Sequence, residues 1–214
     1  MVGTFLEPDG GGENRGELLE LCAEAGNDLI VGNGFLFDAA MNEVAPNYPD
    51  LNFAITDGVA EPSNVRGMLF KHAEGSYLAG IAAALKTKTN NVGFIGGVDF
   101  PLIHEFEQGF LAGVAEINPD IVVQIGYASV PPDFSGFNDP VKGKEIALAQ
   151  YEAGADIIYH AAGGTGTGMF EAAKEVSEAT GSKVWGIGVD FDQYYQVGTP
   201  LPDLQEYILS SMVK

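Results

Sequence analysis

Apolar and polar residues follow two different periods along this chain, and the two kinds of segment take turns. Short, almost continuous apolar runs recur, and between them lie longer segments whose apolar residues are three and four positions apart. The short runs are typical of strands buried on both faces of a parallel sheet, and the longer spacing is typical of amphipathic helices. Their alternation predicts βαβ units, and therefore an α/β fold of mostly parallel sheets flanked by helices.

The pattern also predicts the approximate bounds of each element. It predicts strands at residues 2–6, 28–31, 52–56, 65–71, 92–95, 121–125, 156–159, 184–189 and 205–210. It predicts helices at residues 13–25, 37–47, 76–88, 102–116, 141–152 and 169–180. A polar break at residues 88–91 interrupts the alternation before it starts again, so we expect two similar lobes, at residues 1–90 and 91–193.

Composition narrows the range of partners. The 214 residues include 30 acidic and 10 basic side chains, for a formal net charge of -20, which disfavours nucleic acids and anionic membrane surfaces as partners. Cys22 is the only cysteine, so no disulfide forms within the chain. Residues 1–12 lack the basic and apolar regions of a signal peptide, and no apolar run is long enough to span a membrane.

Two aspartates stand directly after predicted buried strands. Asp57 follows the strand at residues 52–56, and Asp190 ends the strand in KVWGIGVDFDQ, residues 183–193. Ligands of open α/β sheets bind outside the carboxyl ends of the strands, where a carboxylate can accept hydrogen bonds from a sugar or a base. Aspartate also caps turns after strands. From position alone, ligand contact and turn capping are equally good interpretations of Asp190.

The glycine-rich segment AAGGTGTGMF, residues 161–170, follows a strand and precedes a helix. This context suits anion binding at a helix N-terminus, although the spacing matches neither the P-loop nor G-x-G-x-x-G. If Asp190 took the place of a ribose-binding acid, the segment would fit a dinucleotide-dependent enzyme. A tight strand-to-helix connection is the simpler alternative.

No residue pattern in the chain requires catalysis or a metal. His72, His104 and His160 are too far apart for a metal motif, and no nucleophile elbow is present. We therefore expect no catalytic residue, no metal and no cofactor. Four aromatic residues fall in loops predicted at strand carboxyl ends, where each could stack on a planar base or pack against the protein: Phe35, Phe100, Phe134 and Phe137.

The chain resembles a known family along nearly its whole length. The resemblance is carried by EGSYLAGIAAALKTKTNNVGFIGGVDFPLIHEFEQGFLAGV, residues 74–114, and by AGNDLIVGNGF, YPDLNFAITDG, GIGVDFDQ and SSMVK. These segments resemble the basic membrane protein family, also called PnrA-like or Med-like, of ABC-transporter substrate-binding lipoproteins. The resemblance implies a two-lobed type I periplasmic-binding-protein fold that holds a purine nucleoside, such as inosine, adenosine or guanosine, in the cleft between the lobes.

The resemblance also implies ligand-binding positions. Asp57 matches a ligand-side aspartate of the first lobe, and Asp190 matches the second-lobe aspartate expected to bind the ribose hydroxyls. Gly163 and Gly164 match a glycine-rich loop that lines the cleft. Two further positions complete the implied set: Phe35, as a wall of the base pocket, and Lys214, near a crossing between lobes within residues 194–214.

Family members generally begin with a further strand and helix and continue past the SSMVK position. The chain therefore resembles an internal fragment with a complete second lobe and an incomplete first lobe, and we expect it to bind nucleoside weakly or not at all. The resemblance implies ABC permease subunits as partners. It also implies that the full-length protein is an extracytoplasmic, membrane-anchored lipoprotein. A dinucleotide-dependent or nucleoside-cleaving enzyme that uses the same strand-end aspartates is the alternative function.

Overall fold

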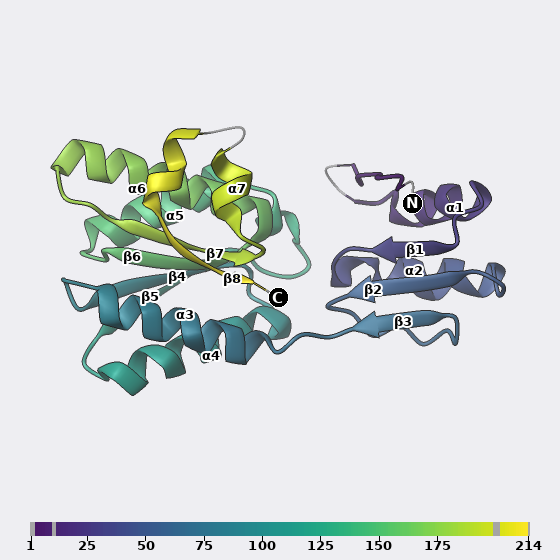
Figure 1. Ribbon diagram of the computed structural model, residues 1–214, viewed down its shortest axis with the longest axis horizontal. Coiled ribbons are helices and arrows are strands. Elements are labelled where there is room, and N and C mark those ends of the chain that lie inside the picture. Colours follow the sequence, from purple (N-terminus) through teal and green to yellow (C-terminus); the bar gives the residue numbers. More distant parts are fainter. Residues whose placement is uncertain (1–2, 10–11, 199–201, 214) are drawn as a thin grey trace. The chain divides into compact units, whose positions relative to one another are not determined.

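The computed structural model describes residues 3–9, 12–198 and 202–213. The chain divides into two compact units, Met1–Phe70 (unit 1) and Lys71–Lys214 (unit 2), and each is described by itself (Figure 1). Lys214 lies outside the described residues, so its predicted place near a crossing stays a prediction. None of the described helices is long and apolar enough to cross a membrane.

Unit 1 is a small parallel sheet with helices on one face. Its strands are β1 (Leu29–Gly32), β2 (Asn52–Thr56) and β3 (Val65–Met68), in that order. The helices are α1 (Arg15–Glu24), α2 (Asp38–Val44) and the short 3-10 turns η1 (Phe35–Phe37) and η2 (Ala45–Asn47). Apolar side chains of α1, α2 and the strands form one buried core, which includes Leu19, Met41, Phe53 and Ile55.

Unit 2 is a five-stranded parallel sheet in the order β5-β4-β6-β7-β8. Its elements, in chain order, are α3 (His72–Lys86), β4 (Asn91–Val98), α4 (Pro101–Ile117), β5 (Val122–Ser129), η3 (Ser135–Phe137), α5 (Pro140–Glu152), β6 (Ile157–Ala161), η4 (Gly163–Thr165), α6 (Gly166–Thr180), β7 (Trp185–Asp190), α7 (Gln193–Gly198), η5 (Pro202–Tyr207) and β8 (Ile208–Val213).

Helices cover both faces of the unit 2 sheet, as the continuous apolar strands predict (Figure 1). One core joins α3 and α4 to strand residues such as Phe94 and Tyr159. The other joins α5 and α6 to the neighbouring strand residues Ile95 and Ile158, which point to the opposite face because side chains alternate along a strand. The predicted α/β class with parallel sheets is confirmed.

The division between the units differs from the boundary predicted at residue 90. Helix α3 belongs to unit 2 because it packs closely on α4 through glycines. A Cβ at Gly80 would lie 2.2 Å from the carbonyl oxygen of Phe110, and one at Gly113 would lie 2.0 Å from that of Tyr77. Strand β8, within the segment 194–214 that we predicted as a crossing between lobes, pairs with β7 as part of the unit 2 sheet.

Three local predictions are wrong. Residues 3–9 form neither helix nor strand, because Phe5 and Leu6 are exposed and have no partner strand among the described residues. Residues 166–168, predicted as loop, are the first turn of α6. Helix α3 begins at His72 rather than at residue 76. Helix α7 and turn η5 were not predicted at all, and they occupy much of the chain between β7 and β8.

Candidate functional site

The carboxyl-end edge of the unit 2 sheet contains most of the predicted ligand residues. Because the sheet is parallel, β4, β6 and β7 all end at this edge. The chain order reverses between β4 and β6, and such a switch point is where ligands of open α/β sheets bind. Gly163 and Gly164 follow β6, and Asp190 ends the adjacent strand β7, so the structure places these three predicted residues at the ends of neighbouring strands.

Asp190 has an unusual backbone conformation. Its φ is 72°, in the left-handed region, and the N–H of Phe191 donates to the carbonyl oxygen of Val189 at 2.9 Å, which closes a tight turn around Asp190. Left-handed backbone in a residue other than glycine is strained by about 1–3 kcal/mol and is concentrated at functional sites. The next helix, α7, is capped by Asp192, whose Oδ1 accepts the N–H of Tyr194 at 3.1 Å. The capping function therefore falls to Asp192, which favours the ligand interpretation of Asp190.

Asp57 shares this feature in unit 1. It follows β2 with a φ of 58°, and its N–H donates to the carbonyl oxygen of Met68 at 2.9 Å. Only one other non-glycine residue in the described chain, Asn90, has positive φ. Asp57 and Asp190 thus share a rare backbone conformation. The sequence analysis selected them by their position and by the family resemblance, neither of which depends on that conformation.

Phe35 lies next to the end of β2, close to Asp57. The hydroxyl of Thr56 accepts the N–H of Gly34 at 2.7 Å and donates to Oδ1 of Asn33 at 2.9 Å, which fixes the loop before Phe35 to the residue before Asp57. The structure therefore brings these two predicted residues of unit 1 together. These hydrogen bonds of Thr56 could not be predicted from the sequence.

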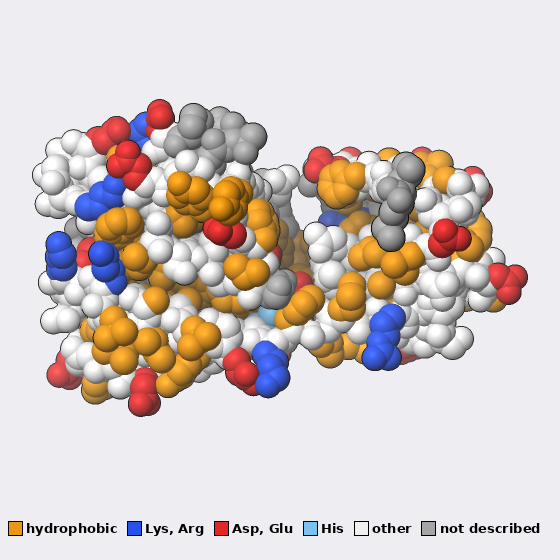
Figure 2. All heavy atoms as spheres, viewed as in Figure 1, with side chains coloured by type: hydrophobic (Ala, Val, Ile, Leu, Met, Phe, Trp, Pro, Cys, Tyr) orange, Lys and Arg blue, Asp and Glu red, His pale blue; other side chains and the backbone are white. Residues whose placement is uncertain are grey.

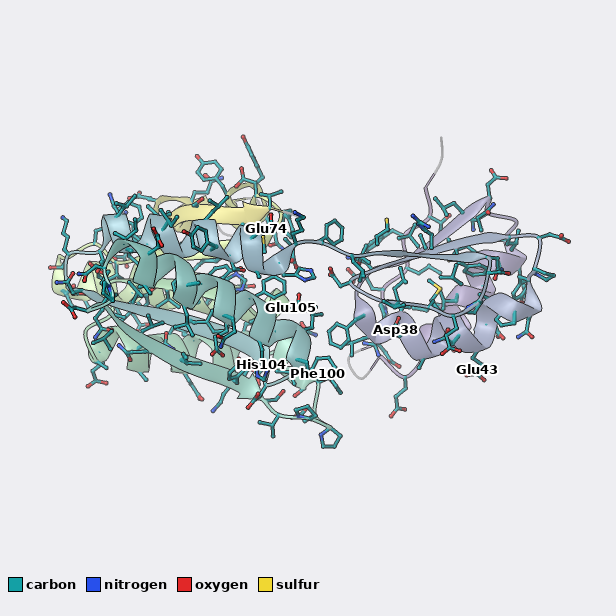
Figure 3. The ribbon with its side chains drawn as sticks, turned by 90° about the horizontal axis from the view of Figure 1, so that it is seen from below. Asp38, Glu43, Glu74, Phe100, His104 and Glu105 are labelled. Carbon is teal, nitrogen blue, oxygen red and sulfur yellow. The ribbon has the colours of Figure 1, made fainter. Side chains whose placement is uncertain are left out.

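Asp38, at the start of α2, is a residue that the sequence reasoning missed (Figure 3). Its buried Oδ1 has no hydrogen-bond partner among the described residues, and burial raises the pKa of its carboxyl against the opposing bond from the backbone of Val59. A Cβ at Gly58 would lie 2.6 Å from this oxygen, so the residue after Asp57 must be small.

Packing explains part of the glycine-rich segment. Gly163 has a φ of 55°, and a Cβ there would lie 3.0 Å from the carbonyl oxygen of Phe137. The hydroxyl of the buried Thr165 accepts the N–H of Asp139 and donates to the carbonyl oxygen of Gly136, both at 2.7 Å. The segment is thus fixed against the loop after β5, and its glycines permit this close approach. Ligand contact by Gly163 and Gly164 stays a prediction.

Two of the predicted loop aromatics meet at the same edge. Phe100, which precedes α4, packs edge-to-face on Phe134 from the loop after β5, with ring centroids 5.7 Å apart. His104, one turn further along α4, bonds through Nε2 to Oδ1 of Asp99 at 2.7 Å and is half exposed (Figure 3). No group of three or more His, Cys, Asp or Glu side chains in the described ranges could hold a metal ion.

His160 and Gln193 form a buried pair behind Asp190. Nε2 of His160 lies 2.7 Å from Oε1 of Gln193, and the same oxygen accepts the N–H of Val189 at 2.8 Å. His160 is 0% exposed and Gln193 is 4% exposed. Burial lowers the pKa of His160 to about 4, against opposing contributions from the bond to Gln193 and the charge of Asp190. The sequence analysis excluded His160 from a metal motif but did not predict this pair.

Comparison with known proteins settles the family. Residues 7–213 match the family described as ABC transporter substrate-binding protein PnrA-like. The chain belongs to the PnrA-like family. Membership confirms the resemblance found in the sequence, and it supports a binding protein rather than an enzyme because the family is one of substrate-binding proteins.

Curated relatives of the PnrA-like chain support this assignment. It is 45% identical over 175 residues to the ABC transporter nucleoside-binding protein BmpA of Lactococcus lactis, a match that covers 80% of this chain and 48% of the relative. It is 41% identical over 200 residues to the CD4+ T-cell-stimulating antigen of Listeria monocytogenes, covering 92% of this chain and 54% of the relative. The chain thus spans about half the length of these relatives.

Solved structures place the PnrA-like chain among periplasmic-binding-protein folds. An ABC transporter solute-binding protein from Aeropyrum pernix superposes with a TM-score of 0.75 at 30% identity, covering 92% of this chain and 54% of that one. A second solute-binding protein, from Conexibacter woesei, superposes with a TM-score of 0.59 at 26% identity, covering 81% of this chain and 55% of that one. The predicted fold is therefore confirmed.

Proposed function

We propose that this chain is the ligand-binding part of an ABC-transporter protein that captures a purine nucleoside. The observation that carries the proposal is the shared left-handed conformation of Asp57 and Asp190, the two aspartates placed at strand carboxyl ends. The name of the relative that is 45% identical, a nucleoside-binding protein, supports the same class of ligand.

The chemistry of the two strand ends suits a nucleoside. A carboxylate at the end of β7 can accept two hydrogen bonds from neighbouring ribose hydroxyls, and a bond to a charged acceptor contributes about 1.5–3 kcal/mol. An aromatic ring such as Phe35 can stack on a planar purine. In the proposed mechanism, strand-end carboxylates bind the ribose and an aromatic ring stacks on the base, so ligand favours the conformation in which these contacts form.

The wider setting follows from the family. ABC permease subunits are the proposed partners, and an extracytoplasmic, membrane-anchored lipoprotein is the proposed form of the full-length protein. A net charge of -20 is consistent with a protein that has no nucleic-acid partner. On the face shown in Figure 2, acidic side chains lie at several separate places on the described surface.

An NMR titration with a panel of ligands tests the proposal. We expect inosine, adenosine or guanosine to shift the amide signals of Asp190, Gly163 and Gly164 saturably, and free ribose or hypoxanthine to act much more weakly. The proposed function narrows the expectation of weak or absent binding to weak binding, with a dissociation constant weaker than micromolar. Micromolar or tighter binding would contradict that expectation of weakness.

The same samples discriminate the enzyme alternative. A dinucleotide-dependent enzyme should bind NAD more tightly than any nucleoside, and a nucleoside-cleaving enzyme should release free base that chromatography detects. Either result would replace the binding-protein proposal. A complete absence of saturable shifts with all three nucleosides at millimolar concentration would overturn it as well.

A further inference from the structure

The backbone of Asp190 is held in its strained conformation by something outside its own turn. The β6–β7 ladder pairs Ile157 with Trp185, Ile158 with Gly186 and Tyr159 with Ile187, and its register ends there. On this side Asp190 therefore lies three positions beyond the last residue of β7 that pairs with β6. On the other side β7 pairs with β8 as far as Asp190, which lies opposite Val213. Strained conformations persist only where surrounding contacts determine them.

The side chain of Gln193 supplies such a contact. After the tight turn at Asp190 the chain enters α7, and Gln193, its first residue, folds back so that its Oε1 accepts the N–H of Val189 at 2.8 Å. The N–H of Gln193 donates to Oγ of Ser211 on β8 at 3.2 Å. The start of α7 is thus fixed to β8 and to the residue immediately before Asp190.

His160 completes the arrangement from the neighbouring strand. The atom of Gln193 that faces the N–H of Val189 must be the amide oxygen, because an N–H requires an acceptor. The same oxygen faces Nε2 of His160 at 2.7 Å, so His160 must carry its proton on Nε2 and donate it. Nδ1 is then a lone pair, and it is buried without a hydrogen-bond partner among the described residues. The geometry alone therefore assigns the tautomer.

Two glycines make room for this pair. A Cβ at Gly188 would lie 2.5 Å from Oε1 of Gln193, and a Cβ at Gly166 would lie 2.0–2.3 Å from ring atoms of His160. The ring also packs edge-to-face on Phe170 of α6, with centroids 5.7 Å apart. Side chains at these two positions would displace the pair, so its presence explains Gly188 and Gly166.

We propose that His160 and Gln193 are positioning residues, which hold Val189 and thereby keep Asp190 in the left-handed conformation that directs its carboxylate to the ligand. The inference rests on the proposed function, because it assumes that Asp190 contacts the nucleoside. Neither His160 nor Gln193 touches ligand in this proposal. Both act on affinity through the backbone of Asp190.

The test compares two substitutions at one position. Gln193→Glu keeps an acceptor oxygen for both Val189 and His160, and Gln193→Leu removes the acceptor at similar size. Gln196→Leu is the matched control, since Gln196 is exposed and its Oε1 accepts a hydrogen bond from the side-chain amide of Gln193. Three quantities are measured: the inosine dissociation constant, the hydrogen-exchange protection of the Val189 amide relative to Ile187, and the ring 15N shifts of His160.

We expect Gln193→Leu to weaken inosine binding by about tenfold or more and to lower the relative protection of Val189 by a similar factor. Both changes have one cause, because the variant loses the buried hydrogen bond that holds Val189 and, through it, the conformation of Asp190. Gln193→Glu and Gln196→Leu should stay within about threefold of the unsubstituted protein on both counts. The unsubstituted protein should show the Nε2–H tautomer. A Nδ1–H tautomer, or equal affinities for the Leu and Glu proteins, would overturn the proposal.

Failure of the proposed function gives a different result. If the unsubstituted protein binds no nucleoside, that function fails, and exchange at Val189 still decides whether the pair holds the turn. Protection of Val189 that is unchanged in Gln193→Leu overturns the positioning role whether or not ligand binds. Lost protection of Val189 with unchanged inosine affinity also overturns it, because releasing the turn would then have no effect on ligand binding.

Discussion

Acidification should destabilise unit 2 through His160. The imidazole is fully buried, and burial lowers its pKa from 6.5 to about 4. The unfolded chain therefore takes up a proton that the folded chain resists, and the stability contributed by the neutral ring is present above pH 6.5 and is lost as the pH falls toward 4. At 1.36 kcal/mol per pKa unit, the loss in unfolding free energy is about 2 kcal/mol by pH 5 and about 3 kcal/mol by pH 4.

The measurement compares the unsubstituted protein with His160→Gln, which removes the titrating group. Urea unfolding is followed from pH 7 to pH 4 by the fluorescence of Trp185, the only tryptophan, which lies in β7 and so reports on unit 2. His160→Gln is less stable at pH 7 because it disturbs the core, but it should lose about 2–3 kcal/mol less on acidification. His104→Gln, which removes a half-exposed imidazole from the same unit, is the control and should retain the full loss.

The result that refutes this reasoning is simple to recognise. If the unsubstituted protein and His160→Gln lose equal stability between pH 7 and pH 4, the ring is not buried in its neutral form. The tautomer assignment and the positioning role of His160 would then have no basis. Because other carboxylates and histidines titrate in the same range, only the difference between the two proteins carries the conclusion.

Three further substitutions test other parts of the structure by urea unfolding. Gly80→Ala should lower the unfolding free energy by about 1–3 kcal/mol, because the new Cβ would meet the backbone of α4. Gly75→Ala on the same helix is the control and should change it much less, because the Cβ there would meet the flexible side chain of Met212. Asp190→Gly should be about 1 kcal/mol more stable than Asp190→Ala, because only glycine takes a φ of 72° without strain; equal stabilities would refute the strain. Asn64→Ala should lower the unfolding free energy of unit 1 by about 2 kcal/mol, because Nδ2 of Asn64 donates to the carbonyl oxygens of Ala45, Tyr48 and Leu51. Unfolding of this variant is followed by circular dichroism, and a change within about 0.5 kcal/mol would contradict the expectation.

The apolar pattern predicted strands β2 and β6 well, because most of their residues are buried. Strand β2 was predicted at residues 52–56 and found at Asn52–Thr56, and the predicted strand at 156–159 corresponds to β6, where every residue is buried. The pattern failed at residues 3–6, whose apolar residues pair with none of the described strands. It also missed α7, whose exposed tyrosines give no apolar face.

The division between the units lies before α3 rather than at residue 90, and hydrophobic periodicity does not show why. The alternation restarts after α3, so a boundary at residue 90 was the natural prediction. The helix belongs to unit 2 because Gly80 and Gly113 let two helix backbones approach, and that contact joins residues far apart in the sequence. Strand β8 likewise joins the sheet through pairing with β7 that the sequence could not specify.

The positions of the candidate ligand residues could be predicted from the sequence, but the contacts that hold these residues in place could not. Strand ends located Asp57 and Asp190, and the family resemblance selected them as ligand residues. The left-handed backbone of both, and the pair of His160 and Gln193 behind one of them, depend on contacts between separate elements. Glycines at 166 and 188 were visible, yet only the structure shows which side chains need the space.

One measurement tests the central claim that Asp190 selects the ribose of a nucleoside. The dissociation constants of inosine and of 2′,3′-dideoxyinosine are compared for the unsubstituted protein, for Asp190→Ala and for Asp120→Ala. Asp120 is the control, because it is exposed and precedes β5, at the opposite edge of the sheet. We expect the unsubstituted protein and the control to prefer inosine by about tenfold or more, and Asp190→Ala to lose that preference. Equal affinity of the unsubstituted protein for the two ligands, or a preference that survives in Asp190→Ala, would contradict the account.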